Sequence, residues 1–400
     1  MRRTDSLKRC IRCLLPETHE TIRFNEEGLC NICQHQDFKR GNIDWNQGKK
    51  RLDQIVEDHR GKYDYDCIVP FSGGKDSTWT LFYLVTHYKL KPLVVRFDHG
   101  FLRPNLNENT TRTLRKMGVD FHTFTPNWKV VQKLMLQSFL EKGDFCWHCH
   151  TGITSYPMQV AVKQNVPLVV WGEPSSEYTA YYSYENDETV DEQKYNRISN
   201  LGINPQDMYL RLGANFDERD LKPFTFPPLK DLRRINMKAI YLGSYVPWDV
   251  KTQSKIIADE LGWQGDRVEN VDPDYSYEKI ECYMQGVRDY IKFIKRGYSR
   301  NSHLAAIDLR NNRISPEKGK QMVDQDGMRP PSLDLFLEFT GLTEPEFMTI
   351  ALKHGVAPYQ HDPSETRAGE KLHDFSQWSK EGAMPKEEAA QLLARWKQRN

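Results

Sequence analysis

One octapeptide dominates this 400-residue chain: Phe71-Ser72-Gly73-Gly74-Lys75-Asp76-Ser77-Thr78. It follows a short apolar run and opens a segment with helical character, 77–88. Paired glycines between a strand and a helix let the backbone approach an anion without a Cβ in the way. Ser72 and the free N–H groups at the start of the helix add donors, and the helix dipole favours negative charge there. Lys75 adds a mobile positive charge. The octapeptide therefore predicts a phosphate-binding loop.

Strand and helix signals alternate outward from this loop. Apolar runs typical of strands occupy 66–71, 92–97, 120–125, 167–172 and 238–245, and helical patterns occupy 77–88, 107–117, 128–141, 151–164 and 249–262. The alternation predicts an α/β fold with a mostly parallel sheet that helices cover on both faces. Ligands of such sheets bind at the carboxyl ends of the strands. Asp98, Gly172 and Glu173 follow strands there, as the octapeptide does.

Regions of different character flank the α/β part, so we expect three domains. They are a cysteine-bearing unit at 1–42, the α/β domain at 43–264, and a helical region at 265–400. An amphipathic stretch at 45–62 predicts a lead-in helix, and the last region has helical patterns at 276–295, 316–325, 333–340, 344–354 and 386–398. The rhythm breaks at 177–230. An acidic, aromatic segment there, 178–184, predicts either a cover over the site or a solvated insertion.

Four cysteines near the N-terminus have the spacing of a zinc ribbon: Cys10-x-x-Cys13, then Cys30-x-x-Cys33. Each pair makes a tight knuckle, and two knuckles close a tetrahedral shell around Zn²⁺. A closed shell leaves no position for water, so we expect a structural ion that staples a unit too short to build its own core. Two unrelated cysteine pairs and an iron–sulfur cluster remain open as alternatives.

A second Cys-x-x-Cys, formed by Cys146 and Cys149, precedes the helical pattern 151–164. The dipole of that helix favours thiolate, which predicts lowered pKa values for the two thiols. Three interpretations stay open. The pair belongs to a second metal site completed by His148 or His150, or it is a reactive thiol pair, or it is a structural pair under the sheet.

The charges of the chain nearly cancel, with 56 Lys and Arg against 55 Asp and Glu. This balance argues against a protein that grips long nucleic acid. No apolar run approaches the roughly 20 residues of a membrane helix, and the first residues lack the apolar core of a secretory signal. We therefore expect a cytoplasmic protein without membrane insertion, in which cysteines stay reduced.

The octapeptide lacks the spacing of a Walker loop and instead resembles the PP-loop of the N-type ATP pyrophosphatases, whose domain is adenine nucleotide alpha hydrolase-like. Within that superfamily the chain is most similar to the N-acetyl sugar amidotransferases. The further markers are Cys10-x-x-Cys13-x-x-Pro16-x-Thr18, Ile22-x-Phe24-x-x-x-Gly28-x-Cys30-x-x-Cys33, Cys146-x-x-Cys149-His150-x-Gly152-Ile153, Trp171-Gly172-Glu173, Pro247-Trp248-Asp249 and Lys295-x-Gly297-Tyr298-x-Arg300.

The resemblance implies a C–N ligase that converts a sugar acetamido group into an acetamidino group in the synthesis of lipopolysaccharide O-antigen and related bacterial surface glycans. The substrate is then a free or nucleotide-linked N-acetyl sugar. ATP is split between its first and second phosphates, which gives an O-adenylyl imidate. Ammonia from a partner glutaminase, with a cyclase-like channel subunit, displaces AMP.

The resemblance and the chemistry of the loop together assign the site residues. The candidate ligands of ATP are Ser72, Gly73, Gly74, Lys75, Asp76, Ser77, Thr78, Asp98 and Gly172. Lys75, Asp76 and Glu173 are the candidate catalytic residues, acting with Mg²⁺ on the charge that develops at the leaving pyrophosphate and the reacting amide. Downstream, Arg300, Arg310 and Arg313 either contact a nucleotide or acidic sugar or form a solvated basic face.

The alternative function is a tRNA thiolase, which combines a PP-loop with a Cys-x-x-Cys and delivers sulfur instead of ammonia. Such a site calls for a third cysteine, and the stretch 170–281 has none. We interpret Cys67 as a core residue of its strand and Cys282 as a core residue of the helical pattern 276–295. The missing basic stripe also argues against a tRNA ligand.

Overall fold

The structure, a computed structural model, describes residues 3–174, 191–213, 216–375 and 382–399. At its centre is a five-stranded sheet in the order β3-β2-β1-β4-β5, and all neighbours in it are parallel. The strands are β1 (Cys67–Pro70), β2 (Pro92–Phe97), β3 (Asp120–Phe124), β4 (Leu168–Trp171) and β5 (Lys238–Tyr241). Each strand lies where the sequence pattern predicted one, so the α/β class is confirmed.

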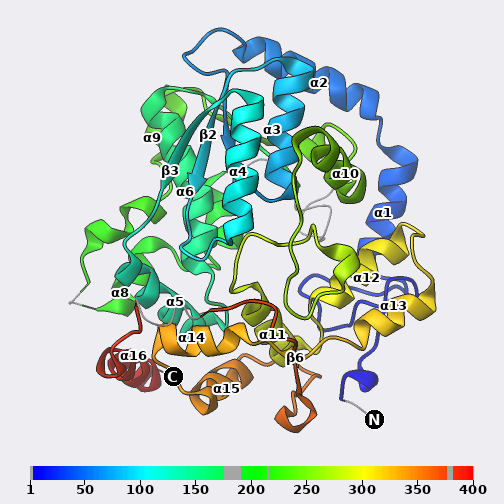
Figure 1. Cartoon of the computed structure of the whole chain (residues 1–400), viewed down its shortest axis with the longest axis vertical. Helices are drawn as coiled ribbons and strands as arrows, with labels where there is room; N and C mark the ends of the chain where they lie inside the picture. The colour runs from blue at the N-terminus through cyan, green and yellow to red at the C-terminus, as the bar shows by residue number, and fades with distance from the viewer. Residues whose placement is uncertain (1–2, 175–190, 214–215, 376–381, 400) are drawn as a thin grey trace.

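Helices cover both faces of this sheet (Figure 1). They include α3 (Lys75–Tyr88), α4 (Pro104–Met117), α6 (Trp147–Gln164) and α10 (Val250–Leu261), whereas α5 (Trp128–Lys142) packs against α6 and the C-terminal helices. Successive side chains of a strand point to opposite faces. Ile68 of β1 therefore shares a core with α6, whereas Val69, in register with Val94 of β2, shares another with α3 and α10. Burial on both faces explains why these strands are apolar throughout.

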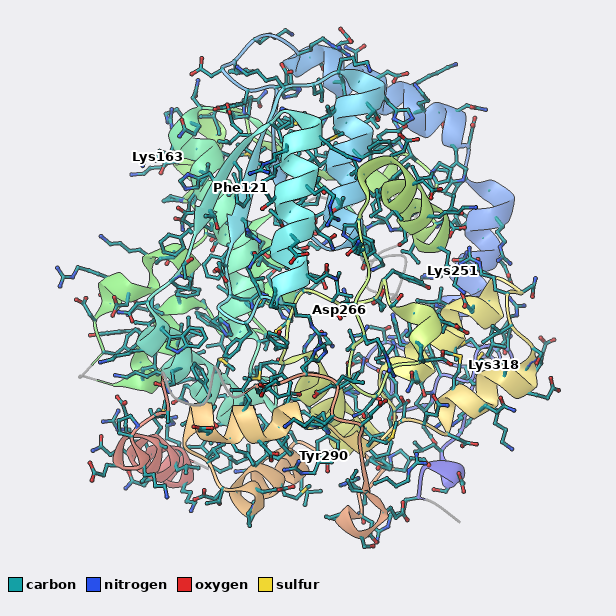
Figure 2. All side chains as sticks on the ribbon, viewed as in Figure 1. Phe121, Lys163, Lys251, Asp266, Tyr290 and Lys318 are labelled. Atoms are coloured by element: carbon teal, nitrogen blue, oxygen red, sulfur yellow. The ribbon has the colours of Figure 1, made fainter. Side chains whose placement is uncertain are left out.

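The C-terminal region is helical, as predicted, and consists of α11 (Gln285–Arg296), α12 (Arg300–Arg310), α13 (Pro316–Val323), α14 (Ser332–Thr340), α15 (Glu344–Lys353) and α16 (Lys386–Arg399). Its α11, α14, α15 and α16 share one apolar core with α5 and α6. Tyr290 of α11, labelled in Figure 2, lies in that core against Phe347 of α15. The helices of this region therefore complete the α/β part instead of standing apart from it.

Two predictions for this region are wrong. The helix predicted at 276–295 begins only at Gln285, because the preceding residues run irregularly across the phosphate loop and Cys282 pairs with Leu102 in a β-bridge. The sequence pattern also did not predict α12. Several polar residues of α12 are buried, among them Ser302 and Asp308, and they obscure its apolar period.

The N-terminal unit folds around the four cysteines and continues into helices. η1 (Arg3–Ser6) precedes the cysteine loops, α1 (Asn31–Asn42) begins at Cys30, and α2 (Trp45–His59) is the predicted lead-in helix. In Figure 1 this unit lies beside α12 and α13, and Tyr298 packs with the cysteines in one small core.

The segment between β4 and β5 is more regular than the sequence indicated. Its described part contains α7 (Glu192–Lys194), the π-helical turn η3 (Tyr195–Ser199), α8 (Pro205–Leu212), η4 (Glu218–Phe224) and α9 (Leu229–Arg234). Met208 and Phe224 anchor it in the core of α5 and α6. The aromatic segment 178–184, predicted as a cover or a solvated insertion, lies outside the described residues.

The remaining short elements are η5 (Leu242–Ser244), η6 (Pro273–Tyr275), η7 (Pro363–Glu365) and the two-residue strands β6 (Met328–Arg329) and β7 (Arg367–Ala368). Among the helices described, none is long and apolar enough to cross a membrane.

Candidate active site

The octapeptide forms a tight loop between β1 and α3. The N–H groups of Ser72 and Gly73 donate to Ser77 Oγ at 3.2 Å, and that of Gly74 donates to Ser72 Oγ at 3.2 Å. Gly74 is the N-cap of α3, and no side chain caps the helix there. The loop therefore presents a helix N-terminus and two hydroxyl groups, which is the arrangement that favours an anion.

Both glycines of the loop are required by close approaches. Gly73 has a φ of +86°, and a Cβ on it would lie 2.7 Å from Thr110 Oγ1 of α4. A Cβ on Gly74 would overlap the carboxyl group of Glu281. The loop is thus packed between α4 on one side and the segment before α11 on the other.

A cavity of about 350 Å³ opens beside the loop, at the carboxyl ends of β1, β2 and β4. The predicted site residues that line it are Ser72, Asp76, Ser77, Gly172, Glu173, Cys146 and Cys149. Gly172 allows the close packing of this wall, because a Cβ there would lie 2.8 Å from Thr80 Oγ1 and 3.2 Å from Trp248. Three predicted site segments, separated in the sequence, therefore meet at one cavity.

Lys75 is buried and fixed, not mobile as predicted. Its Nζ lies 2.8 Å from Asp76 Oδ2 and 2.8 Å from Glu278 Oε2, and the side chain is 3% exposed. Burial alone would lower the pKa of Lys75, but the two carboxylates raise it well above its ordinary value. Lys75 therefore ties the loop to the segment before α11. Thr78, also a predicted ATP ligand, is buried in α3.

Glu173 and Asp76 line the same cavity. Burial, and next the negative charge of Asp76, raise the pKa of Glu173 well above its ordinary value. Asp76 Oδ1 is buried and has no hydrogen-bond partner among the described residues. A carboxyl group with a raised pKa beside an unsatisfied carboxylate oxygen is typical of a site that accommodates charge changes.

Asp98 takes part in a turn and does not line the cavity. Its Oδ1 accepts the N–H of Gly100 at 2.8 Å, and its Oδ2 accepts the hydroxyl of Thr125 at 3.3 Å. The neighbouring His99 lines the cavity instead. The role of Asp98 in nucleotide binding thus stays a prediction.

Cys146 and Cys149 line the cavity together with a third cysteine, Cys282. The interpretation of Cys282 as a helical core residue is wrong, because it lies before α11 and is partly exposed to the cavity. The sequence carried this signal, since Cys282 is one position beyond the stretch 170–281. The segment before α11 brings Cys282 to the cavity that Cys146 and Cys149 line.

The thiols of this trio have raised pKa values, contrary to the prediction of thiolates. Burial is the first cause for Cys146, Cys149 and Cys282, and it raises the pKa of Cys282 to about 12. Desolvation outweighs the dipole of α6 here. These cysteines do not form a compact single-ion site with His148 or His150, since only the N-terminal cysteines gather three or more ligand atoms within 4.8 Å, among residues the structure describes.

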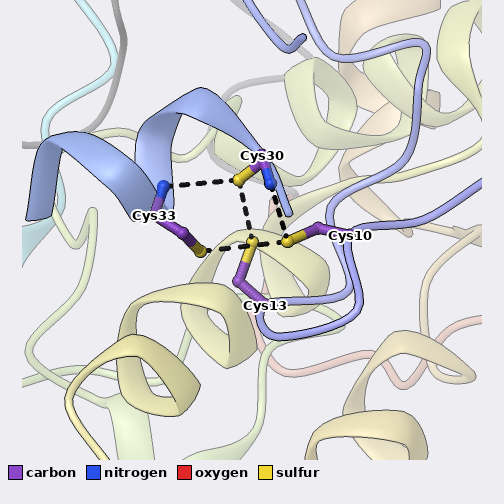
Figure 3. A group of neighbouring side chains, drawn as sticks. All are labelled: Cys10, Cys13, Cys30 and Cys33. Carbon is purple, nitrogen blue, oxygen red and sulfur yellow. Dashed lines mark hydrogen bonds between the residues drawn. The ribbon is translucent and has the colours of Figure 1, made fainter. Parts of the chain in front are cut away.

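The N-terminal cysteines do form a compact site (Figure 3). Cys13 and Cys30 sulfurs are 3.6 Å apart, Cys10 and Cys33 sulfurs are 3.9 Å apart, and all four residues are 0% exposed. Bonds of about 2.3 Å set the edges of a tetrahedral Zn–S₄ shell at about 3.8 Å. The geometry therefore fits one tetrahedral ion in a closed four-cysteine shell.

Of the downstream arginines, Arg300 and Arg313 are held by acids, Arg313 through Asp249 at 2.5 Å, and Arg310 is buried. Arg300 pairs with Asp289 at 3.2 Å and Glu278 at 3.5 Å, and Arg310 is 4% exposed. A solvated basic face is therefore wrong for these two. Around them, Lys251 bonds Asp308 at 2.5 Å and Lys318 bonds Asp272 at 3.0 Å; both lysines are labelled in Figure 2.

Comparisons with known proteins leave the family open. No family model matches the chain. The uncharacterized protein MJ1599 of Methanocaldococcus jannaschii is 29% identical over 116 residues, which are 28% of this chain and 40% of that protein. The U34-tRNA thiolase NcsA from Methanococcus maripaludis, solved with its [4Fe-4S] cluster, aligns over 79% of this chain and 86% of its own with 13% identity and a TM-score of 0.33. The chain thus spans well under half of the curated relative, and neither match assigns a function.

Proposed function

We propose that this protein is a PP-loop enzyme that uses ATP to adenylylate a carbonyl oxygen and then replaces that oxygen with sulfur. One observation carries the proposal: a single cavity joins the loop, Glu173 and the three cysteines Cys146, Cys149 and Cys282. The acceptor class that fits this chemistry is an amide-type carbonyl, and we take a nucleobase of tRNA as the first candidate.

The loop fits the phosphates of ATP. Its backbone is approached closely at both glycines. The N–H groups of Ser72, Gly73 and Gly74 donate to the hydroxyls of Ser72 and Ser77, which an incoming anion can replace. The unsatisfied Asp76 Oδ1 fits a divalent cation. Mg²⁺ held there would neutralise charge on the leaving pyrophosphate.

The residues of the cavity then have separate tasks. The loop holds the pyrophosphate portion, so that the acceptor oxygen can attack the α-phosphorus in line. Burial and the charge of Asp76 raise the pKa of Glu173, so this acid would repel the phosphates less than an exposed glutamate would. Lys75 keeps Asp76 in place through their 2.8 Å ion pair.

The three cysteines supply the sulfur side of the reaction. Their sulfurs are not gathered as at the N-terminus, which suits a larger iron–sulfur cluster with one open position or separate reactive thiols better than a single zinc ion. A cluster held by Cys146, Cys149 and Cys282 would bind the incoming sulfur. Overall, the acceptor, ATP and hydrosulfide give the thio-product, AMP and pyrophosphate.

A second function, the conversion of a sugar acetamido group into an acetamidino group, has its own support. Gly172 and Trp248, both part of the amidotransferase markers, are in contact beside the loop. The activation step is the same, and ammonia from a partner glutaminase takes the place of sulfur. The near-neutral charge of the chain also suits a small substrate better than tRNA.

For the N-terminal site we propose Zn²⁺ in a structural role. The sulfur spacing and complete burial of Cys10, Cys13, Cys30 and Cys33 support one ion without an open position.

One experiment separates the two functions. Protein purified without oxygen is assayed for iron, zinc and acid-labile sulfide. It is then incubated with ATP and Mg²⁺, with sulfide or ammonium, and with either unmodified tRNA or a panel of N-acetyl sugars. We expect AMP, pyrophosphate and a product in which sulfur replaces oxygen. A product with NH in place of oxygen favours the second function, and formation of ADP contradicts both.

A further inference from the structure

A second, smaller cavity of about 110 Å³ lies next to the cavity that Cys146, Cys149 and Cys282 line, which we call the cysteine pocket. Three separate regions enclose it: Glu20 of the N-terminal unit, the turn with Asp144 between α5 and α6, and one side of α11 with the start of α12. Arg288 lines this cavity and the larger one. Asp144 also connects the two cavities, because it lines the smaller one and its Oδ1 accepts the N–H of Cys146, which lines the larger one, at 2.8 Å.

The lining of the small cavity carries more positive than negative charge. Five cationic side chains face three carboxylates, those of Glu20, Asp144 and Asp289. Glu278 reaches Arg300 from outside the cavity at 3.5 Å, which leaves an excess of one positive charge. Burial lowers the pKa of Lys292, and the charge of Glu20 offsets that effect only in part.

Three of the ion pairs in this cavity are long. Lys292 and Arg296 lie 3.6 and 3.4 Å from Glu20, and Arg288 lies 3.6 Å from Asp144. Arg288 Nε is buried without a hydrogen-bond partner among the described residues. A purely structural network closes with short, paired contacts. Arg300 is paired with Asp289 at 3.2 Å and Lys295 donates to the carbonyls of Lys142 and Gly143, whereas Arg288 Nε remains available beside a space large enough for a few small molecules.

We propose that this cavity binds a small monovalent anion and delivers hydrosulfide past Arg288 to the cysteine pocket. The inference rests on the proposed sulfur chemistry and names its sulfur donor as the inorganic anion. A cationic lining concentrates anions and excludes ammonium. In the full reaction the sulfur of hydrosulfide bonds the adenylylated carbon, its proton stays on the product, and AMP leaves with the former carbonyl oxygen.

The first test uses bromide, which needs no activity. Crystals of the full chain are soaked in sodium bromide, and anomalous scattering locates the ion. We expect bromide between Arg288 and Lys292, and none there in Lys292→Met crystals. Bromide only at the outer surface overturns the anion site, whatever reaction the enzyme catalyses.

The second test measures sulfide kinetics in Lys292→Met. This variant should fold, because Glu20 keeps Arg296 and the hydroxyl of Tyr298 as partners. We expect the KM for sulfide to rise roughly tenfold, with kcat at saturating sulfide retained, and Lys292→Arg to restore KM. Lys320→Met, which removes the same charge from the exposed face of α13, is the control.

The outcomes distinguish a failure of hydrosulfide delivery from a failure of the proposed thiolation. A bound bromide with an unchanged KM in Lys292→Met overturns hydrosulfide delivery. If no thio-product forms at all, the proposed function fails, and the bromide result alone still decides whether the cavity is an anion site.

Discussion

The two groups of cysteines in this molecule differ in almost every physical respect. Those at the N-terminus come from two short loops, are fully buried and hold their sulfurs 3.6 and 3.9 Å apart in the two pairs measured. Cys146, Cys149 and Cys282 come from two segments more than 130 residues apart and line a cavity that Ser72, Asp76 and Ser77 of the octapeptide also line. A closed shell stabilises a fold, whereas an open group of thiols that lines a cavity is suited to chemistry.

The surroundings of the two groups make the same distinction. Apolar side chains such as Leu15 and Ile32, with Tyr298, enclose the N-terminal group. Charged and polar side chains, including Glu173, Lys279 and Arg288, share the cavity with the second group. The same residue type therefore serves structure in one place and, by our proposal, reaction in the other.

The largest effect should follow from breaking the N-terminal group. Cys13→Ser removes one of four ligands from a buried shell, so we expect unfolding stability to fall by about 5 kcal/mol or more, with loss of zinc. Chemical denaturation and metal analysis measure it. Cys282→Ser is the matched comparison and should keep both the stability and the zinc of the parent protein. Equal loss in the two variants would contradict the division of roles.

The reverse variant tests the second group. Cys282→Ser should reduce formation of the thio-product by about a hundredfold or more, because the group acts as a unit. Thermal unfolding should stay near that of the parent protein, since Cys282 is only partly buried. Unchanged formation of the thio-product in this variant would contradict a role of Cys282 in sulfur transfer.

A third variant asks whether the second group belongs to a nucleotide site at all. Gly73→Ala forces a side chain into a backbone with φ of +86° and against Thr110. ATP affinity, measured by calorimetry, should fall about tenfold, which is about 1.4 kcal/mol. Gly41→Ala, where a Cβ meets nothing within 4 Å, is the control. Unchanged affinity would separate the loop from ATP.

The smallest effect concerns pH. The pKa of Glu173 is raised in the folded protein by burial and by Asp76, so its proton is held above the pH at which the unfolded chain releases it. The stability that this proton contributes is therefore full in acid and is lost as pH rises through the raised pKa. The side chain of Glu173→Gln cannot ionise. Between acid and mildly alkaline pH, the thermal midpoint of this variant should therefore fall a few degrees less than that of the parent protein. The exposed Glu260→Gln is the control; a parallel pH profile for Glu173→Gln and the parent would contradict the assignment.

Much of the fold could be predicted because each strand and helix is indicated by a pattern of residues that are close together in the sequence. The strand β2 has the bounds 92–97 that its apolar run predicted, and α3 begins two residues before the predicted 77. The site was harder to predict. Ser72, Asp76 and Glu173 do meet at one cavity, but Lys75 is locked in ion pairs and Asp98 is used in a turn.

By itself, the sequence determined the α/β class, the position of the phosphate loop and the four-cysteine shell, because each depends on residues that are neighbours along the chain or on a regular period. Only the tertiary structure decided that Cys282 joins Cys146 and Cys149, that Glu278 holds Lys75, and that a charged cavity lies behind Arg288. These contacts join distant segments, and they form through the packing of whole helices against the sheet, which no local pattern encodes.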